Sequence, residues 1–376
     1  MKMILRWFPY GDDSVTLQQI RQTPGISGVA TCFPNIPVGE VWQPDMLAAL
    51  KEELNGAGLE MEVIESYNVH EDIKKGLPSR DRYIENYIES IRNMAGAGVK
   101  CICYNFMPAL DWARSDMARE LPDGSRALSY RHSEVLAKTP QAIVDSTLGK
   151  SEGFSLPGWE PERLRTIAED IEFYKGMDEE TYWEHLRYFL AAVIPEAERC
   201  GVRMGIHPDD PPWPIYGLPK IICDARNIRR FLALHDSPAN GLTLCTGSLG
   251  SNTGNDIPAI AAEFAGRIPF AHIRNVKHLA ERDFDESAHL SACGDLDMFA
   301  IVRALHAGGF DGYVRPDHGR MIWGEKARPG YGLYDRAIGA NYLLGLWEAV
   351  DKTSGAGGNA SGAGAADKTS GAGAQE

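Results

Sequence analysis

Residues 181–207, TYWEHLRYFLAAVIPEAERCGVRMGIH, contain the pattern from which the fold of this chain is inferred. Apolar side chains from Tyr182 to Ala197 recur with the spacing of a helix that buries one face. Gly201 then ends the helix, and the short β-rich run 203–207 follows at once. A helix that leads directly into a short apolar strand is the repeating unit of a parallel α/β sheet.

The same unit recurs on both sides of this stretch. Helical periodicity is also visible over 81–97 and 296–307. The other short β-rich runs are 3–8, 27–33, 60–66, 100–106, 241–246, 268–274 and 312–316. Eight strands alternating with helices predict an α/β TIM (β/α)8 barrel. A doubly wound open sheet is the alternative, but PYGDDSV, which follows Phe8, lacks the Gly-rich phosphate turn usual there.

Two segments do not fit the repeat. The first, at about 108–178, lies between the strand at 100–106 and the next helix, and it contains a helical stretch. Because it follows the carboxyl end of a strand, we expect it to form a helical cap over the site within one catalytic domain, 1–350. The second is the Gly/Ala/Ser-rich segment 351–376, where DKTSGAG occurs twice. It has too few apolar residues to offset its ordering entropy, so we expect a disordered, flexible tail.

Composition excludes several classes of protein. The net charge of −14 disfavours general binding to nucleic acid or anionic membrane. No segment approaches the roughly 18–20 apolar residues that span a bilayer, and the amino terminus lacks the features of a signal peptide. The seven cysteines form no CxxC pair, which favours a reduced, cytoplasmic location over a disulfide framework.

The carboxyl ends of the last four predicted strands carry residues that bind metals. They are His207, Cys245, His272 and Asp317. Each alone would more often be an ordinary buried or hydrogen-bonded residue, but in a closed barrel these strand ends are neighbours. We therefore expect the four side chains to bind one divalent cation. The thiolate favours Fe²⁺ or Zn²⁺, whereas Mn²⁺ or Fe²⁺ would leave positions for a substrate, so the residues alone leave the metal open.

Groups able to transfer protons or bind an anion lie near this predicted cluster. His318 follows Asp317, and a histidine is the usual general acid or base. Tyr331, in RPGYG, is a second candidate, with Tyr334 as its rival. Arg6, Arg274 and Arg315, on strands or at their ends, are candidates to hold a substrate carboxylate. His70, after the third strand, and Asn105, near the end of the fourth, complete the expected substrate-binding set.

At these residues the sequence resembles the mannonate dehydratase family. The resemblance covers almost all of 1–350 and is most specific in the combination of HPDDPP, CTGS and RPDHG, with further matches at ESYNVHEDIK, CYNFMPALDWARSD and RPGY. It implies a TIM barrel with Mn²⁺ or Fe²⁺ held by His207, Cys245, His272 and Asp317. It also implies that His318 and Tyr331, not Tyr334, are the catalytic pair.

The implied reaction is the metal-dependent dehydration of D-mannonate to 2-dehydro-3-deoxy-D-gluconate in hexuronate degradation. Which of His318 and Tyr331 is the acid and which the base stays open. The resemblance also suggests a homodimer or larger homo-oligomer. Two other functions are alternatives. One is a metal-dependent sugar isomerase on the same barrel, but such sites are rich in carboxylates and contain no thiolate, so Cys245 argues against it. The other is a protein that binds a sugar acid or a metal without catalysis.

Overall fold

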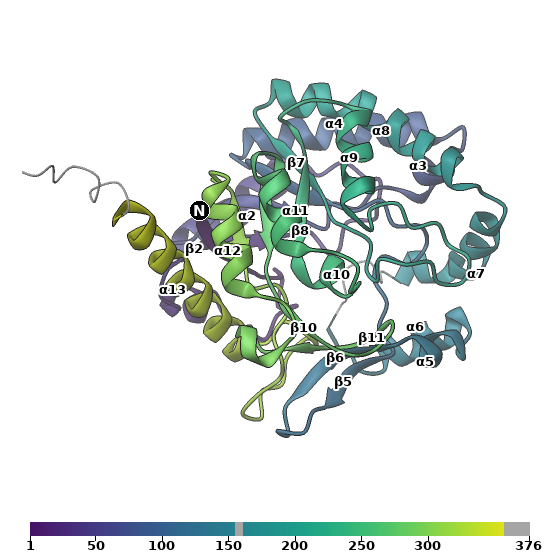
Figure 1. Ribbon diagram of the computed structural model, residues 1–376. Coiled ribbons are helices and arrows are strands. Elements are labelled where there is room, and N and C mark those ends of the chain that lie inside the picture. Colours follow the sequence, from purple (N-terminus) through teal and green to yellow (C-terminus); the bar gives the residue numbers. More distant parts are fainter. Residues whose placement is uncertain (155–160, 357–376) are drawn as a thin grey trace, which may run out of the picture.

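The structure is a computed structural model that describes residues 1–154 and 161–356. Within these residues, eight parallel strands close into a barrel, as predicted (Figure 1). In the order in which they pair around the barrel, the strands are β1 (Lys2–Arg6), β12 (Tyr313–Arg315), β9 (Phe270–His272), β8 (Asn240–Cys245), β7 (Arg203–Ile206), β4 (Cys101–Tyr104), β3 (Glu60–Glu65) and β2 (Ile26–Thr31).

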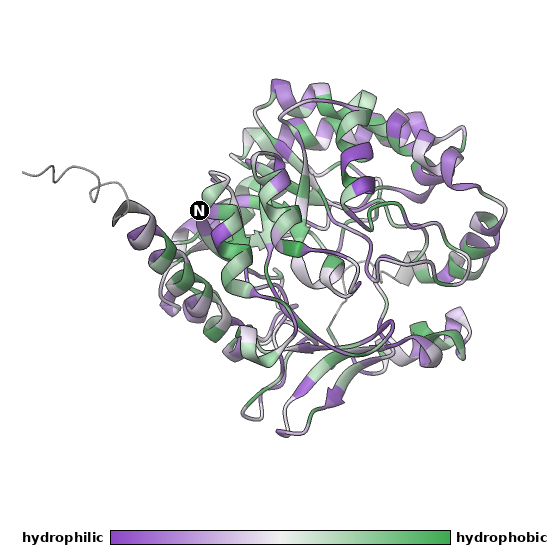
Figure 2. Ribbon diagram, in the orientation of Figure 1, coloured by the Kyte–Doolittle hydropathy of each residue, from purple (hydrophilic) through white to green (hydrophobic). Residues whose placement is uncertain are grey.

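Each barrel strand is followed along the chain by a helix of the outer layer. These helices are α1 (Leu17–Gln22), α2 (Pro44–Gly56), α4 (Arg80–Gly96), α8 (Glu179–Arg199), α9 (Ala225–Leu234), α11 (Ile257–Phe264), α12 (Met298–Ala307) and α13 (Tyr334–Ala356). Helix α8 illustrates why they form: Asp178 caps its first turn by accepting the Thr181 N–H, and its apolar face is buried. The outer helices accordingly show both hydrophilic and hydrophobic residues along their length (Figure 2).

The barrel interior has its own small apolar cluster, separate from the core between strands and helices. It consists of Ile4, Ala30, Val63, Cys101, Cys103, Phe270 and Tyr313, all on barrel strands. Side chains alternate between the two faces of a strand, so residues that do not face the helices fill the inside of the barrel. This filling closes the barrel below the strand ends and leaves the carboxyl-terminal mouth for the site.

Two insertions build a cap beside that mouth. The expected insertion after β4 contains the helices α5 (His132–Leu136), α6 (Pro140–Leu148) and α7 (Pro161–Lys175), and also the hairpin β5 (Asp116–Glu120) and β6 (Arg126–Arg131). The second insertion follows β9 and is the hairpin β10 (Asn275–Ala280) and β11 (Asp283–Ser287). The hairpins join in an antiparallel sheet of order β10-β11-β6-β5, which lies at one end of the barrel (Figure 1). The helical cap is confirmed, whereas both hairpins were missed.

The shorter elements complete the chain. They are α3 (Glu71–Lys75), α10 (Thr246–Gly250) and the 3₁₀ turns η1 (Ala265–Arg267) and η2 (Ser291–Cys293). The predicted start of the tail at residue 351 is corrected, because α13 continues to Ala356. The rest of the predicted tail, 357–376, lies outside the described residues. Among the described helices, none combines the length and the apolar character that a membrane span requires.

Candidate active site

The register of the barrel brings three predicted metal ligands together. Cys245 at the end of β8 pairs with His272 at the end of β9, and His207 directly follows the neighbouring strand β7. One ligand atom from each of these residues lies within 4.8 Å of the other two. The fourth predicted ligand, Asp317, contacts two of them: its Oδ2 accepts the Cys245 thiol at 3.3 Å, and its Oδ1 lies 3.8 Å from His272 Nδ1.

The chemical state of these side chains suits a divalent cation. His207 Nδ1 lies 2.7 Å from the Pro208 carbonyl oxygen, which can only accept, so Nδ1 carries the proton and Nε2 keeps a free lone pair. His272 is fully buried, and among the described residues its Nε2 has no hydrogen-bond partner. Burial lowers the pKa of both histidines, which keeps their imidazoles neutral. Neutral imidazole is the form that binds a metal.

Cys245 and Asp317 supply the negative charge. Burial, reinforced by the Asp317 carboxylate, raises the pKa of the Cys245 thiol to about 12. A cation placed between them would reverse that effect and favour the thiolate. Burial would raise the pKa of Asp317 as well, but Arg315, His318 and Arg274 hold it well below its usual value. The residues present therefore fit the predicted metal.

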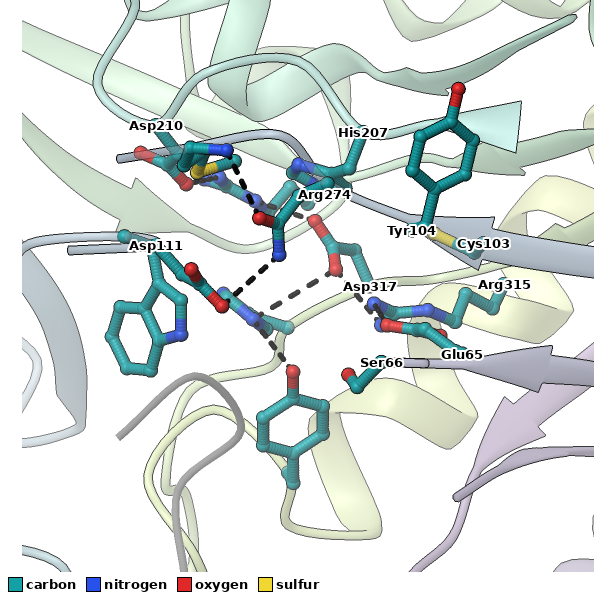
Figure 3. A pocket seen from close by; sticks show the side chains of 15 residues that line it. Glu65, Ser66, Cys103, Tyr104, Asp111, His207, Asp210, Arg274, Arg315 and Asp317 are labelled. Carbon is teal, nitrogen blue, oxygen red and sulfur yellow. Dashed lines mark hydrogen bonds and ion pairs between the residues drawn. The ribbon is translucent and has the colours of Figure 1, made fainter. Parts of the chain in front are cut away.

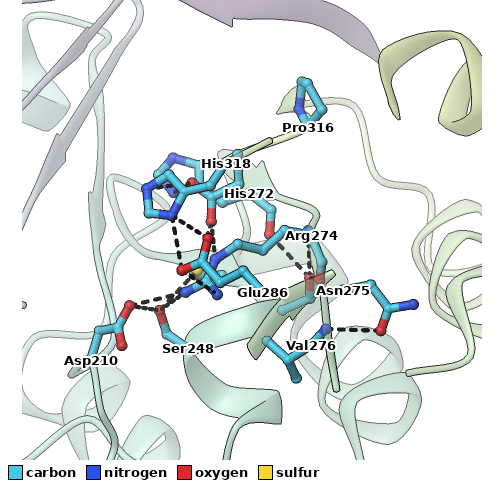
Figure 4. A network of polar contacts seen from close by, with 12 residues as sticks. Asp210, Ser248, His272, Arg274, Asn275, Val276, Glu286, Pro316 and His318 are labelled. Atoms are coloured by element: carbon cyan, nitrogen blue, oxygen red, sulfur yellow. Dashed lines mark hydrogen bonds and ion pairs between the residues drawn. The ribbon is translucent and has the colours of Figure 1, made fainter. Parts of the chain in front are cut away.

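A buried ion network connects Asp317 to the cap. Arg274 contacts Asp317 at 2.7 Å, Asp210 at 2.9 Å and Glu286 at 3.1 Å. Arg114, from the β4 insertion, pairs with Asp210 through both of its terminal nitrogens at 2.8 Å and with Glu286 at 2.7 Å. Figure 4 shows Arg274 with two of its partners, Asp210 and Glu286. The network joins residues from the barrel and from both insertions, so it fixes the cap relative to the strand ends.

The predicted catalytic pair is in contact. His318 Nε2 lies 3.2 Å from the Tyr331 hydroxyl oxygen, and its Nδ1 lies 2.9 Å from Glu286 Oε2. The Tyr331 ring packs edge-on against Phe8, with ring centroids 5.4 Å apart. Burial raises the pKa of Tyr331 to about 12, although Arg315 opposes this shift, so the phenol keeps its proton at neutral pH.

Many of these groups line one cavity at the mouth of the barrel (Figure 3), but Cys245 and His272 do not. Its walls include the following predicted residues: Asn105, His207, Arg274, Arg315, Asp317, His318 and Tyr331. Arg315 pairs with Glu65 and Asp317 at 2.7 and 2.8 Å, and Asn105 donates to Asp111 at 3.0 Å. The cavity thus combines cationic, anionic and amide groups, which can fix the orientation of a polar ligand.

Two predicted substrate-binding residues do not line this cavity. Arg6 donates to the Glu65 carbonyl oxygen at 2.9 Å, to Cys32 Sγ at 3.0 Å and to Ser66 Oγ at 3.3 Å. It therefore supports Glu65 and Ser66, which do line the cavity. His70 caps α3 and lines a different cavity.

Among the site residues that were not predicted are Glu65, Asp210 and Glu286. Glu65 ends β3, so the rule that selected the other strand ends would also have selected it. Asp210 follows His207 by three residues within HPDDPP, where its acidic side chain was a visible signal. Glu286 lies on β11, and no local pattern marks it, because only the pairing of the two hairpins brings it to His318.

Comparison with known proteins gives consistent matches over nearly the whole chain. A family model described as D-mannonate dehydratase (UxuA) matches residues 1–356. The mannonate dehydratase of Thermotoga neapolitana is 57% identical over 354 residues, which are 94% of this chain and 98% of that protein. That of Geobacillus thermodenitrificans is 53% identical over 353 residues, 93% of this chain and 95% of that protein.

Solved structures agree with this result. The crystal structure of mannonate dehydratase from Streptococcus suis serotype 2 has a TM-score of 0.84 and 44% identity, and the match covers 94% of this chain and 95% of that one. An L-ribulose 3-epimerase structure has a TM-score of 0.53 at 13% identity. At that identity the likeness is one of fold alone, so it does not support the isomerase alternative.

Proposed function

The chain belongs to the D-mannonate dehydratase family, and from that premise we propose how its barrel site performs the reaction. The chain is a lyase that dehydrates D-mannonate to 2-dehydro-3-deoxy-D-gluconate. The observation that carries the proposal is the cluster of His207, Cys245 and His272 within 4.8 Å, beside the contact between His318 and Tyr331. Two of the proposed metal ligands, His207 and Asp317, line the same cavity as the two proton-transfer groups, an arrangement that a purely binding protein would not need.

His207, Cys245, His272 and Asp317 are the proposed ligands of Mn²⁺ or Fe²⁺. When bound, such a cation acts as a Lewis acid that makes the C2 proton of a bound hydroxy acid more acidic. The four ligands contribute two negative charges, from the Cys245 thiolate and the Asp317 carboxylate, so they offset the charge of a divalent cation. Arg315, on the cavity wall, adds the positive charge that an anionic substrate needs in a protein of net charge −14.

His318 and Tyr331 handle the protons in this proposal. Tyr331 holds its proton at neutral pH and is the donor to the departing C3 hydroxyl group. His318, through Nε2, is the base that takes the C2 proton. The C2–H electron pair forms the C2–C3 double bond, the C3–O bond breaks, and water leaves with the proton from Tyr331. The resulting enol tautomerises to the 2-keto acid, and the proton held by His318 returns to Tyr331 across the 3.2 Å contact.

The test is anaerobic purification, treatment with EDTA and parallel reconstitution with Mn²⁺ or Fe²⁺, followed by an assay of D-mannonate for a 2-keto-3-deoxy acid. We expect EDTA to abolish turnover and one of the two metals to restore it. Undiminished turnover in a protein shown by elemental analysis to be metal-free would contradict the proposed metal dependence. Epimeric hexonates in the same assay would define the substrate preference.

The homo-oligomeric state stays a prediction. Size-exclusion chromatography with light scattering gives the mass of the particle directly. A mass of twice the chain's 41.3 kDa, or a larger multiple, would agree with the prediction, and a monomer at assay concentration would contradict it.

A further inference from the structure

The hairpin β10–β11 brings a carboxylate to His318 from outside the barrel. Glu286 lies on β11, and this strand pairs with β6 of the other insertion. Its Oε2 lies 2.9 Å and its Oε1 3.1 Å from His318 Nδ1. Glu286 is 5% exposed and is not part of the cavity wall. Its carboxylate contacts His318, the predicted base (Figure 4), from outside the cavity wall.

The surroundings of Glu286 keep it ionised. Burial alone would raise its pKa, but Arg274, His318 and Arg114 lower the pKa to about 2. An ionised carboxylate has no proton to donate, so the contact with His318 requires a proton on Nδ1. A neutral imidazole carries one proton, and Nε2 is then left with its lone pair.

That lone pair faces Tyr331. The Tyr331 hydroxyl lies 3.2 Å from His318 Nε2 and, with its proton in place, donates to it. The opposite tautomer would have to place the bare Nδ1 against a carboxylate, which repels it. The Glu286 contact therefore selects the one tautomer in which Nε2 can accept a proton.

We propose that Glu286 is a positioning residue that holds His318 with its proton on Nδ1 and with the lone pair of Nε2 facing Tyr331 and the substrate. The proposal rests on the proposed role of His318 as the base. Arg274 and Arg114 fix the orientation of the Glu286 carboxylate, because their terminal nitrogens lie 3.1 and 2.7 Å from its Oε1. The hairpin after β9 thus completes the catalytic pair as well as the cap.

A direct test reads the tautomer without turnover. Full-length protein labelled with ¹⁵N at histidine and treated with EDTA is examined at pH 9 by long-range ¹H–¹⁵N correlation. The spectrum of His318→Gln identifies the His318 signals by their absence. We expect the pattern of an Nδ1–H imidazole in the wild type and a shift toward Nε2–H in Glu286→Gln, whose amide can donate to Nδ1. An Nε2–H pattern for His318 in the wild type would overturn the proposal, whatever the variant does.

Kinetics with the metal-reconstituted enzyme give the second measurement. We expect Glu286→Gln to lower kcat by about 10²–10⁴-fold with KM nearly unchanged, as when the orienting carboxylate of a catalytic histidine is replaced by its amide. Glu286→Asp should recover part of the loss, because it keeps the charge. A kcat for Glu286→Gln within about threefold of the wild-type value would overturn the proposal. Such a change is smaller than the factor of ten that corresponds to about 1.4 kcal/mol in activation free energy.

Asp285→Asn is the matched control. Asp285 adjoins Glu286 on β11, but it pairs with Arg131 at 2.8 Å and also contacts Ser129, so it stabilises the cap sheet without contacting His318. We expect this variant to keep the wild-type tautomer and kcat. An equal loss of kcat in Asp285→Asn would assign the effect to the cap sheet and overturn the specific role of Glu286. If D-mannonate were not turned over at all, the proposed function would fail, while the spectra would still decide the tautomer.

Discussion

Arg274 is the residue whose loss should most disturb the site. Its side chain is 1% exposed, and its guanidinium group pairs with three carboxylates, those of Asp317, Asp210 and Glu286. Arg274→Met keeps most of the aliphatic volume and removes the charge. The three carboxylates then stay buried with one cationic partner fewer. This lowers the free energy of unfolding, because a charge away from water must be paired.

The magnitude follows from what each carboxylate retains. In Arg274→Met, Asp210 and Glu286 are still paired with Arg114, and Asp317 is still paired with Arg315 at 2.8 Å. Breaking a buried pair typically costs 3–5 kcal/mol, and because every carboxylate keeps one guanidinium partner we expect the lower end, about 3 kcal/mol. Equilibrium unfolding in urea of the EDTA-treated protein at pH 7.5 measures this loss. Arg229→Met, which breaks the exposed pair with Glu263, is the control and should change the midpoint far less.

The loss of unfolding free energy in Arg274→Met should be smaller at acidic pH than at neutral pH. The pKa of Glu286 is lowered in the folded protein to about 2 from 4.5, so its ionised form stabilises the fold above pH 4.5. This contribution is lost as the pH falls from 4.5 toward 2. Without Arg274 the carboxylates protonate at higher pH, so the difference between variant and wild type should be smaller at pH 4 than at pH 7.5. A loss below about 1 kcal/mol at pH 7.5, or one equal at both pH values, would refute the reasoning.

Three further substitutions test individual assignments. Cys245→Ser should remove bound metal and activity together, as measured by elemental analysis and the 2-keto acid assay; a variant that still binds one metal ion per chain would refute the role of Cys245 as an essential ligand. Tyr331→Phe keeps the ring packed on Phe8 and should lower kcat by about 10²–10⁴-fold with metal content unchanged, so near-normal turnover would remove Tyr331 from the mechanism. His70→Ala should leave kcat/KM close to wild type, because His70 lines another cavity; a loss of about tenfold or more would show that it reaches the substrate.

The barrel was predictable because its signals are local. Each helix and strand shows its own periodicity, as in the segment from Tyr182 to the strand Arg203–Ile206, and the number of repeats then indicates the closed barrel. His207, Cys245 and His272 were predicted from a simple rule: metal-binding residues at the carboxyl ends of neighbouring parallel strands lie close together. The rule needs only the position of each strand end in the sequence. The rule failed for Arg6, which ends β1 but donates to Glu65, Cys32 and Ser66 and does not line the cavity.

The cap hairpins were not predictable in the same way. Strands β5, β6, β10 and β11 are short, and β6 pairs with β11, about 150 residues away in sequence (Ser129 with Asp285). Sheet pairing depends on partners, so a short strand without its partner in view has little signal of its own.

By itself, the sequence determined the eight-fold repeat, the strand-end residues and the family, because each depends on spacing and residue type along the chain. Only the tertiary structure decided which atoms meet. In the folded chain the Glu286 carboxylate contacts His318, and Arg274 pairs with three carboxylates. His70 lines a separate cavity. The physical reason is that orientation and pairing of buried charges depend on contacts between segments far apart in sequence, and no local pattern encodes these contacts.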